Sequence, residues 1–418
     1  MWHNAPMRLL FVADGRSPIA TNWIRYFTER GDEVYLASTF ACQPDLDLKG
    51  LEIIPVAFSG TKRSSSPAAS YPASSQALGL SAPAPLSPAR RPRGADVRTR
   101  SGVPLWIRNV IRHTLGPLTI ARSAPRLRAM IERLRPELVH AMRIPYEGML
   151  AADAYTGIPL LVSVWGNDFT LHGPSTRLMR HYTHWTVKVA NALHADCQRD
   201  VRLAQEWGFP PRRPTLVVPG NGGIRPDIFY PPEKPVETPV VINPRGFRTY
   251  VRNDVFFKAI PLVLKEIPKA RFLCTSMAGE SQVLQWIKEL GIKHAVELQA
   301  PMPHAQMADV YRRAAVLVSP SIHDGTPNTL LEGMACGCFP VAGDLESIRE
   351  WITDGENGLL TDANNSDRLA ESIVRALKSK DLREQAAGLN AKRIAEKGEY
   401  NACMSQVSTF YQRIIRNS

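Results

Sequence analysis

The sequence has few cysteines and no long apolar run, and both shortages narrow the class of protein. Only six of its 418 residues are cysteine, and no two of them form a Cys-x-x-Cys pair. A disulfide framework or a structural zinc site needs more cysteines at tighter spacing. No run of about 18 apolar residues occurs, which argues against a membrane-spanning helix. The opening residues also lack the apolar core of a signal peptide, so we expect a cytoplasmic protein.

The excess of positive over negative charge comes from one segment. The chain has 51 Lys and Arg against 39 Asp and Glu, a net charge of +12. Residues 61–143 contain 15 basic and 3 acidic residues, so the rest of the chain is neutral. Within this segment, residues near 60–102 are rich in Ser, Ala, Pro and Arg, a composition typical of a disordered insertion. An anionic membrane surface is therefore a candidate partner, with peripheral binding at the inner face of the membrane.

Binding of nucleic acid is a weaker interpretation of the same segment. Base stacking uses aromatic side chains between the basic ones, and residues 61–143 contain only Tyr71 and Trp106. Residues 103–135 look helical and basic, and Pro117 and Pro125 are expected to break them into pieces.

Apolar runs alternate with amphipathic stretches along the first half of the chain. Strands are predicted at residues 7–13, 33–37, 137–141, 159–164 and 192–195, with a helix around Trp23, Ile24 and Phe27. Strand, helix and strand within about 30 residues form a βαβ unit, which requires a parallel sheet. The first half is therefore predicted to be a Rossmann-like domain.

The same pattern returns after a glycine-rich turn at residues 219–223. Strands are predicted at residues 240–243, 271–275, 296–298, 315–319 and 339–342, with helices at 255–266, 282–290 and 307–314. We predict an α/β protein of two doubly wound domains facing a cleft, residues 1–220 and 221–395. Residues 396–418 are predicted to be a C-terminal helix that packs back on the first domain; Ser366 is a candidate N-cap for the preceding helical region.

The segment 318–341 indicates an anion-binding site. A strand ends at Pro320, a polar turn follows, and Thr326 and Pro327 suit the N-cap and first position of a helix. The free amides of Asn328 and Thr329 then lie at the positive end of the helix dipole, where a phosphate binds well. Glu332 is three and four residues further on, over the same face, where it could accept hydrogen bonds from ribose hydroxyls.

This segment resembles the retaining nucleotide-sugar glycosyltransferases of the GT-B fold, family 4, also called glycosyl transferases group 1. Two acidic residues separated by seven, Asp324 and Glu332, precede a small-residue helix and a Pro-Val strand at residues 333–341. The family usually has Glu at the first acidic position and Gly where this chain has Pro327. The resemblance implies catalytic roles for Asp324 and Glu332, and a donor contacted by Gly325, Thr326, Asn328, Thr329 and Glu332.

The resemblance also implies a basic pair for the donor diphosphate, on the loop that follows the first strand of the second domain. Arg245 matches the family's arginine, and Arg252 stands roughly where the family has lysine. A guanidinium fits two phosphate oxygens, so the replacement is chemically reasonable. Arg248 competes for the second role, and the sequence leaves this choice open.

Candidate acceptor residues follow buried strands of the first domain. Trp165 and His172 follow the strand at 159–164, and Asp168 between them is a candidate catalytic residue or a helix cap. Gly15 and Arg16 follow the first strand, where relatives have a glycine-rich loop. We expect all five near the acceptor.

No metal or other cofactor is expected. The one Asp-x-Asp pair, Asp45 and Asp47, lies in a proline-containing loop far from the predicted phosphate site. The predicted function is retaining transfer of a hexose from a nucleoside diphosphate sugar to a glycan, lipid or small-molecule acceptor. The alternatives are a non-hydrolysing sugar-nucleotide epimerase on the same fold, and a basic membrane- or nucleic-acid-binding protein.

Overall fold

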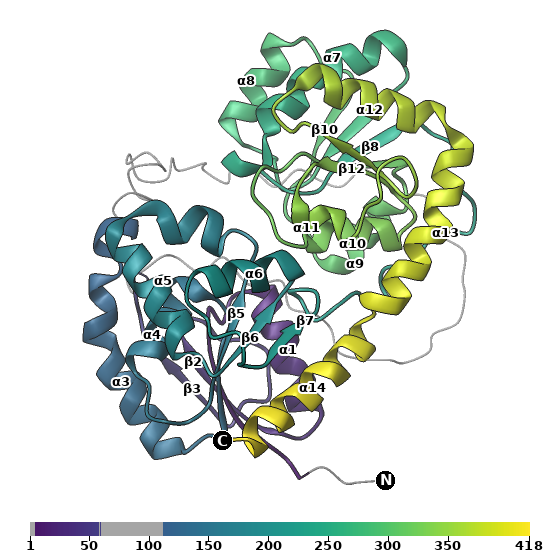
Figure 1. Ribbon diagram of the computed structural model, residues 1–418. Coiled ribbons are helices and arrows are strands. Elements are labelled where there is room, and N and C mark those ends of the chain that lie inside the picture. Colours follow the sequence, from purple (N-terminus) through teal and green to yellow (C-terminus); the bar gives the residue numbers. More distant parts are fainter. Residues whose placement is uncertain (1–4, 58, 60–111) are drawn as a thin grey trace, which may run out of the picture.

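Two parallel sheets, each covered by helices, make up the chain (Figure 1). The computed structural model describes residues 5–57, 59 and 112–418. The insertion predicted near residues 60–102, and most of the basic segment, lie outside these residues. All six cysteines lie within them and are free thiols, five of them buried.

The first sheet has seven strands in the order β3-β2-β1-β4-β5-β6-β7, and every neighbouring pair is parallel. Its strands are β1 (Arg8–Ala13), β2 (Glu33–Ser38), β3 (Gly50–Ile53), β4 (Leu138–Ala141), β5 (Leu160–Val164), β6 (Ala192–Ala195) and β7 (Thr215–Val217). The five predicted strands are confirmed. The short strands β3 and β7 were not predicted; they lie at the two edges of the sheet, where partial exposure weakens the apolar signal.

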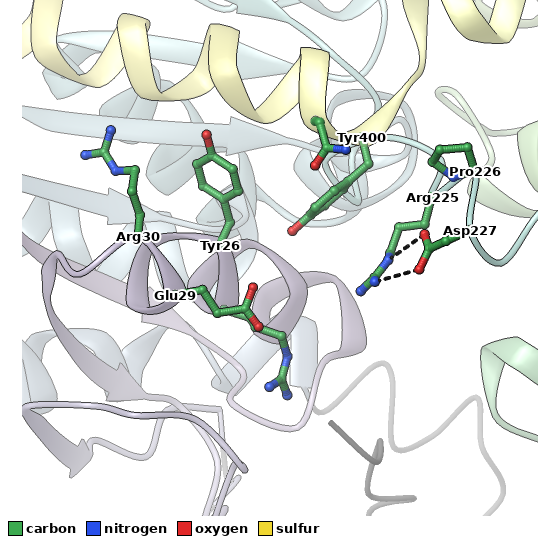
Figure 2. Close-up of a pocket in the computed structure, with 9 residues that line it drawn as sticks. Tyr26, Glu29, Arg30, Arg225, Pro226, Asp227 and Tyr400 are labelled. Atoms are coloured by element: carbon green, nitrogen blue, oxygen red, sulfur yellow. Dashed lines mark hydrogen bonds and ion pairs between the residues drawn. The ribbon is translucent and has the colours of Figure 1, made fainter. Parts of the chain in front are cut away.

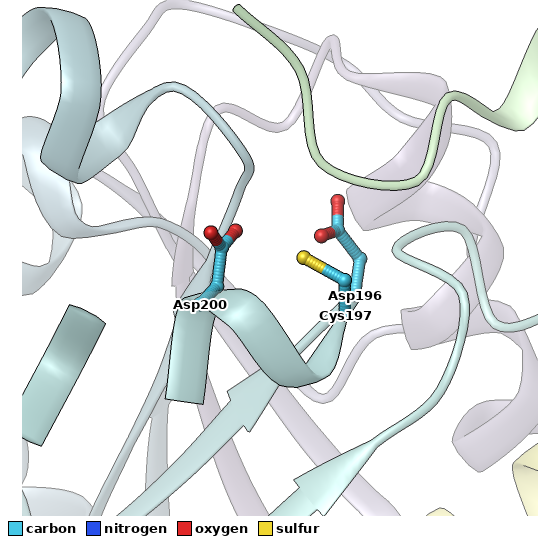
Figure 3. A group of neighbouring side chains, drawn as sticks. All are labelled: Asp196, Cys197 and Asp200. Carbon is cyan, nitrogen blue, oxygen red and sulfur yellow. The ribbon is translucent and has the colours of Figure 1, made fainter. Parts of the chain in front are cut away.

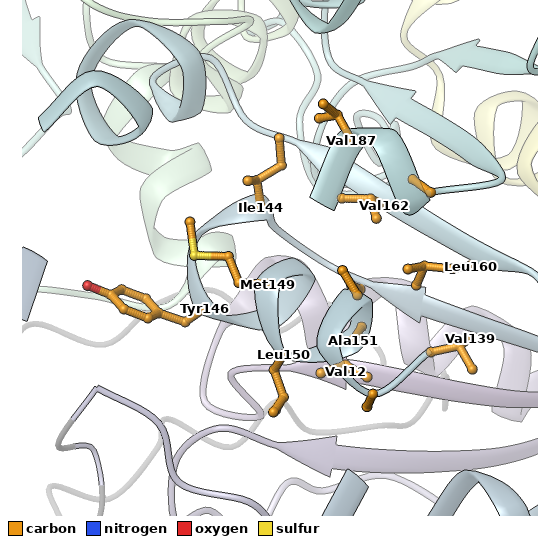
Figure 4. Close-up of a cluster of buried hydrophobic side chains, with 14 of the residues drawn as sticks. Val12, Val139, Ile144, Tyr146, Met149, Leu150, Ala151, Leu160, Val162 and Val187 are labelled. Carbon is orange, nitrogen blue, oxygen red and sulfur yellow. The ribbon is translucent and has the colours of Figure 1, made fainter. Parts of the chain in front are cut away.

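Helices connect these strands and bury their apolar faces against the sheet. They are α1 (Pro18–Glu29), α3 (Leu118–Leu134), α4 (Met149–Asp153), α5 (Arg177–Val189) and α6 (Gln198–Glu206). Short π- and 3-10-helical turns, η1 (Ile144–Gly148), η2 (Asp168–His172) and η3 (Gly173–Ser175), precede α4 and α5. Figure 4 shows residues of η1 and α4, among them Met149 and Leu150, beside valines and leucines of β1, β4 and β5.

The prediction about the two prolines is half wrong. Pro117 does precede a new helix, because it stands at the N-cap of α3. Pro125, however, lies inside α3 on its exposed side, and the helix continues through it. One face of α3 buries Ile120, Leu127 and Met130, and this packing outweighs the one backbone hydrogen bond that proline removes.

The second sheet has six parallel strands in the order β10-β9-β8-β11-β12-β13. Its strands are β8 (Val240–Asn243), β9 (Arg271–Cys274), β10 (Val296–Leu298), β11 (Val316–Ser319), β12 (Phe339–Gly343) and β13 (Leu359–Thr361). Its helices are α7 (Asn253–Glu266), α8 (Ser281–Glu289), α9 (His304–Tyr311), α10 (Asn328–Ala335), α11 (Glu346–Arg349), α12 (Ser366–Lys378) and α13 (Lys380–Lys397), with a short turn η4 (Thr249–Val251). The five predicted strands and three predicted helices are confirmed within a few residues; β13 was not predicted.

The predicted N-cap of α12 is one residue out. Asn365 is the cap, and its side chain accepts hydrogen bonds from the amides of Asp367 and Arg368. Ser366 is the first residue of the helix. Asparagine and serine are equally good caps, so the two adjacent residues could not be separated by residue type.

The last helix, α14 (Tyr400–Arg416), returns to the first domain (Figure 1). Its buried residues, including Met404 and Tyr411, share a hydrophobic cluster with β1 and α1. The rings of Phe27 and Tyr411 are stacked with centroids 4.7 Å apart. The chain therefore crosses between the domains twice, once in each direction.

The two crossings are hydrogen bonded to each other. The amide of Ile224 donates to the Gly398 carbonyl at 2.6 Å, and the Tyr400 amide donates to the Ile224 carbonyl at 3.0 Å. Gly223 has φ +109°, and a Cβ there would lie 2.8 Å from the Gly398 carbonyl oxygen. Only glycine lets the two segments approach this closely.

A chain of buried hydrogen bonds runs through the first domain to α14. His194 contacts the Val218 carbonyl (3.1 Å) through Nε2 and the Ser163 hydroxyl (2.8 Å) through Nδ1. Ser163 also contacts Nε2 of His140 (2.8 Å), whose Nδ1 contacts the hydroxyl of Tyr411. One consistent set of donors satisfies every group when both histidines are neutral. Burial lowers the pKa of both, that of His194 to about 4.

These buried hydrogen bonds predict that the fold loses stability in acid. His194 has a pKa near 6.5 when unfolded, so its neutral form stabilises the fold fully above that pH. This contribution is lost as the pH falls from about 6.5 towards 4, because the unfolded state takes up the proton first. The His194→Gln variant does not titrate there, and should lose on the order of 3 kcal/mol less unfolding free energy between pH 7 and 4. Urea unfolding of both proteins at the two pH values measures this, and equal losses would contradict it.

Candidate active site

An ion pair between two loops of the second domain is at the centre of the site. Asp324 lies between β11 and α10, and Arg245 follows β8. An Nη2 atom of Arg245 is 2.6 Å from Oδ2 of Asp324, and the two side chains are only 9% and 15% exposed. Burial raises the pKa of Asp324, while Arg245 and, more weakly, Arg248 oppose this shift. The pair thus brings together the predicted first acid and the predicted arginine.

Helix α10 begins beside this pair, one residue later than predicted. Pro327, in extended conformation, is the N-cap, and Asn328 is the first helical residue. Thr326 does not cap the helix, because its hydroxyl donates to the Asp196 carbonyl of the first domain at 2.6 Å. It also accepts from the indole nitrogen of Trp351 at 3.1 Å. The structure therefore assigns Thr326 to the contact between the domains.

Buried polar atoms gather around the start of α10. Among the described residues, Oδ1 of Asn328 and Oγ1 of Thr329 are buried without a hydrogen-bond partner. The same holds for side-chain oxygens at the carboxyl ends of β9, β10, β11 and β13, on Thr275, Gln299, Ser319 and Thr361. Buried polar groups are normally paired, so such a group is typical of a site for a polar ligand. Nothing in the sequence distinguishes these four, because each is an ordinary residue at a strand end.

Glu332 lies one turn into α10 and is 4% exposed. The Tyr311 hydroxyl donates to its Oε2 at 3.2 Å. Burial raises the pKa of Glu332, and His304, Tyr311 and Arg245 act against this shift. This hydrogen bond fixes one carboxylate oxygen on the same helix that presents Asn328.

The two arginines that compete for the second basic position differ in their contacts. Arg252 lies at the N-cap of α7 and is paired with Asp254, its Nε and Nη2 each 3.0 Å from a carboxylate oxygen. Its Nη1 contacts Asn364. Arg248 is exposed, contacts the Tyr250 hydroxyl at 2.9 Å and lowers the pKa of Asp324. The guanidinium of Arg252 is thus paired within its own domain. Its assignment to the diphosphate stays a prediction, with Arg248 as its competitor.

In the first domain, Trp165 and His172 are brought together with Arg143. The guanidinium carbon of Arg143 lies 5.3 Å from the centre of the Trp165 ring. Nε1 of Trp165 and Nδ1 of His172 are buried and have no hydrogen-bond partner within the described part of the chain. Burial, followed by the charge of Arg143, lowers the pKa of His172 to about 2, so this imidazole is neutral. A neutral imidazole and an indole N–H suit a hydroxyl-bearing ligand.

Asp168, predicted to be a catalytic residue or a helix cap, is enclosed within the first domain. Its carboxylate is fully buried and accepts from Nε of Arg143 (3.0 Å) and from the amides of Trp165 (3.1 Å) and Ile144 (3.4 Å). Burial raises its pKa, and Arg143 is the largest effect in the other direction. Asp168 therefore orients Arg143 and the turn around it, and its catalytic role stays a prediction.

Gly15 and Arg16 are also engaged within the first domain. The Gly15 amide donates to the Ser38 hydroxyl at 3.1 Å, and a Cβ on Gly15 would lie 2.4 Å from the Cys42 sulfur. Arg16 pairs with Asp14 at 2.8 Å and stacks on the Phe40 ring. Glycine is needed at position 15 for close packing against Cys42, and the acceptor contacts expected of this loop stay a prediction.

The loops of the two domains touch beside Asp324. A Cβ on Gly166 would lie 1.6 Å from the Gly325 nitrogen, and a Cβ on Gly325 would lie 2.2 Å from Oδ1 of Asp196. Gly325, predicted to contact the donor, is thus also packed against the first domain. Neither position has room for a side chain while the domains are in contact.

Asp196, Cys197 and Asp200 form the one group in the described part of the chain with the spacing of metal ligands (Figure 3). All three are buried, and burial raises the pKa of both carboxyl groups. The Arg199 guanidinium is 2.6 Å from Asp200, and its positive charge balances that carboxylate. Asp45 and Asp47, by contrast, are exposed.

A hollow of about 560 Å³ lies away from these loops, where the chain crosses between the domains (Figure 2). It is lined by Tyr26 of α1, Arg30 at the C-cap of that helix, the ion-paired Arg225 and Asp227, and Tyr400. It shares no residue with the Asp324 site. No helix in the described ranges has the length and apolar character to cross a membrane.

Two family models match the chain. Residues 21–220 match the glycosyl transferase 4-like domain, and residues 225–393 match glycosyl transferases group 1. The two matches meet where the chain first crosses between the sheets. They account for the two doubly wound domains separately.

Curated relatives match over part of their length. A D-inositol 3-phosphate glycosyltransferase of Thermobispora bispora is 27% identical over 249 residues, 55% of this chain and 57% of the relative. The enzyme of the same name from Acidothermus cellulolyticus is 36% identical over 211 residues, 46% of each chain. The chain thus spans about half the length of these relatives.

Solved structures share the fold over the whole chain. Sucrose-phosphate synthase from Thermosynechococcus elongatus has a TM-score of 0.71 at 14% identity, and the superposition covers 98% of this chain and 100% of the synthase chain. HepE from Anabaena, in complex with UDP-glucose, has a TM-score of 0.67 at 14% identity and covers 97% and 100%. These likenesses show the two-domain GT-B fold.

The contact between the domains predicts the effect of one methyl group. The Gly166→Ala variant places a Cβ against the Gly325 backbone, and overpacking of this kind costs about 1–3 kcal/mol. Its melting temperature should fall by about 5 °C. Gly388→Ala is the matched control, because that helical position has open space and alanine favours helix there. Equal melting temperatures for the two variants in a thermal scan would contradict the close contact.

Proposed function

The chain belongs to the group 1 glycosyltransferases, and we propose that it transfers a hexose from a nucleoside diphosphate sugar to an acceptor with retention at the anomeric carbon. The observation that carries this proposal is the Arg245–Asp324 pair beside the first turn of α10, surrounded by unpaired buried oxygens. A cation, a carboxylate and a helix N-terminus together suit a sugar joined to a diphosphate.

The donor is proposed to bind to the second domain. Arg245, Arg248 and the amides of Asn328 and Thr329 hold the diphosphate, whose charge they balance. Glu332 accepts hydrogen bonds from the ribose through the oxygen that Tyr311 leaves free. Asp324 orients hydroxyls of the transferred sugar. A UDP-sugar is the first donor to test, because HepE, which shares the fold, was solved in complex with UDP-glucose.

The proposed chemistry depends on stabilising the leaving group. The bond from the anomeric carbon to the β-phosphate oxygen breaks, and the diphosphate takes the bonding electrons. Arg245 and the α10 amides stabilise this developing charge, and Asp324 supports the positive charge on the sugar ring. The proposal invokes no glycosyl–enzyme intermediate, so no carboxylate serves as a nucleophile. We therefore propose front-face attack by the acceptor hydroxyl, whose proton passes to the leaving phosphate.

The acceptor is proposed to bind to the first domain, beside Trp165 and His172. Arg143 adds a positive charge there, and its side chain is 29% exposed. The relatives' name, D-inositol 3-phosphate glycosyltransferase, describes a phosphorylated polyol acceptor. We propose a hydroxyl-rich acceptor, glycan, lipid head group or small molecule, with an anionic group that pairs with Arg143.

The donor site predicts a binding defect for Arg245→Ala. Hydrogen bonds to charged groups contribute about 1.5–3 kcal/mol, so UDP binding should weaken by about 10- to 100-fold. Isothermal titration of UDP into wild type and variant measures this. Arg368→Ala is the control, since Arg368 is an exposed arginine of the same domain that pairs with Glu371. Equal UDP affinities for Arg245→Ala and the wild type would contradict the diphosphate site.

Transfer is expected to need no divalent metal, because arginines and a helix N-terminus take the place of the ion. Dialysis against EDTA should leave the rate of UDP release with a glucosyl donor and acceptor within about twofold of the untreated rate. Loss of activity that Mg²⁺ or Mn²⁺ restores would overturn this.

NMR of the product should show the donor's anomeric configuration. Conversion of the donor to an epimer without acceptor would instead identify an epimerase.

A further inference from the structure

Arg199 is a buried arginine that the proposed chemistry does not use. It is the second residue of α6 in the first domain and is 8% exposed. Its Nε and Nη2 donate to Oδ1 of Asp200 at 2.9 and 2.6 Å, and Nη2 also donates to the Gly166 carbonyl at 2.7 Å. These bonds hold the guanidinium against its own domain.

The remaining nitrogen of Arg199 reaches the second domain. Nη1 donates to the backbone carbonyl of Asp324 at 2.6 Å and lies 3.2 Å from the Ser347 hydroxyl. Ser347 itself donates to the same carbonyl at 2.8 Å. The Asp324 carbonyl thus accepts one hydrogen bond from each domain.

Neighbouring contacts keep α6 in this position. Glu350 of the second domain accepts hydrogen bonds from the amides of Gln198 (2.9 Å) and Arg199 (3.1 Å), which are free at the start of a helix. Figure 3 shows the start of α6 with Asp196 pointing towards a segment of the second domain. Gly325 of the second domain is packed against Asp196, since a Cβ on Gly325 would lie 2.2 Å from Asp196 Oδ1. The contact is therefore closely packed and centred on the residues around Asp324.

Asp324 is consequently held from two sides. Arg245 of its own domain fixes the carboxylate, and Arg199 of the other domain fixes the backbone. If the domains separate, the carbonyl loses its charged donor and the loop keeps only Ser347. The Arg245 pair and the α10 amides, which lie entirely in the second domain, keep their places.

We propose that Arg199 is a positioning residue that makes sugar transfer depend on contact between the domains. The proposal rests on the function above, in which Asp324 orients the transferred sugar. Arg199 aims Asp324 at the sugar and contributes little to the diphosphate site. Its loss should therefore reduce turnover without reducing nucleotide affinity.

The test compares Arg199→Lys with Arg202→Ala. Lysine keeps a charge beside Asp200 but lacks the fork that reaches Gly166 and Asp324 together. We expect kcat to fall at least 30-fold, UDP affinity to stay within threefold, and amides of residues 320–330 to exchange hydrogen at least tenfold faster. Arg202, also on α6, forms an exposed pair with Glu346 across the domains and should change none of the three.

Ser347→Ala keeps the test decisive if Arg199→Lys does not fold. It removes the second donor to the same carbonyl, and should lower kcat by about three- to tenfold with unchanged UDP affinity. Wild-type kcat and exchange in a folded Arg199→Lys would overturn the proposal, as would a loss of UDP affinity as large as the loss of kcat. If the wild type transfers no sugar, the proposed function fails, and hydrogen exchange still shows whether Arg199 orders the Asp324 loop.

Discussion

The parallel direction of every strand places the functional residues of this protein. In a parallel sheet all carboxyl ends lie at one edge, and the loops that leave them carry the ligand site. Trp165 follows β5, Arg199 follows β6, Arg245 follows β8 and Asp324 follows β11. Two such edges that face each other bring residues more than 100 positions apart into contact. The site is a product of topology before it is a product of individual side chains.

Charge at the contact between the domains is buried, and this favours specificity over stability. A buried ion pair gains little net free energy, because removing both ions from water costs as much as their attraction returns. Arg199 has five hydrogen bonds to Asp200, Gly166, Asp324 and Ser347, so it is well satisfied only in one arrangement of the loops. A hydrophobic contact would tolerate sliding. These polar bonds define the register of one domain on the other.

The sequence predicts what is local and apolar, and fails where a distant partner intervenes. Ten strands follow from short apolar runs, because buried parallel strands are apolar on both faces. Thr326 looks like a helix cap, and nothing near it in the chain reveals that Asp196 uses its hydroxyl. Arg199 is the second residue of an ordinary amphipathic helix, and its partner Asp324 lies 125 residues away.

Some features of the site are local in the sequence, and others appear only in the fold. The pairing of Arg252 with Asp254, only two residues away, is a contact that the sequence can indicate. The unpaired oxygens of Thr275 and Thr361, in contrast, acquire meaning only when the strand ends are placed together. The family pattern located Asp324 and Glu332 because their spacing is carried by one loop and one helix.

The return of α14 to the first domain has a consequence for synthesis of the chain. The first domain buries Met404, Phe410 and Tyr411 together with Phe11 and Trp23, so its core contains residues from both ends of the described sequence. The second domain is contiguous, and it is inserted within the first. On the ribosome, residues 221–398 can therefore fold as a unit while the first domain still waits for α14. The earlier-synthesised domain is the later one to be completed.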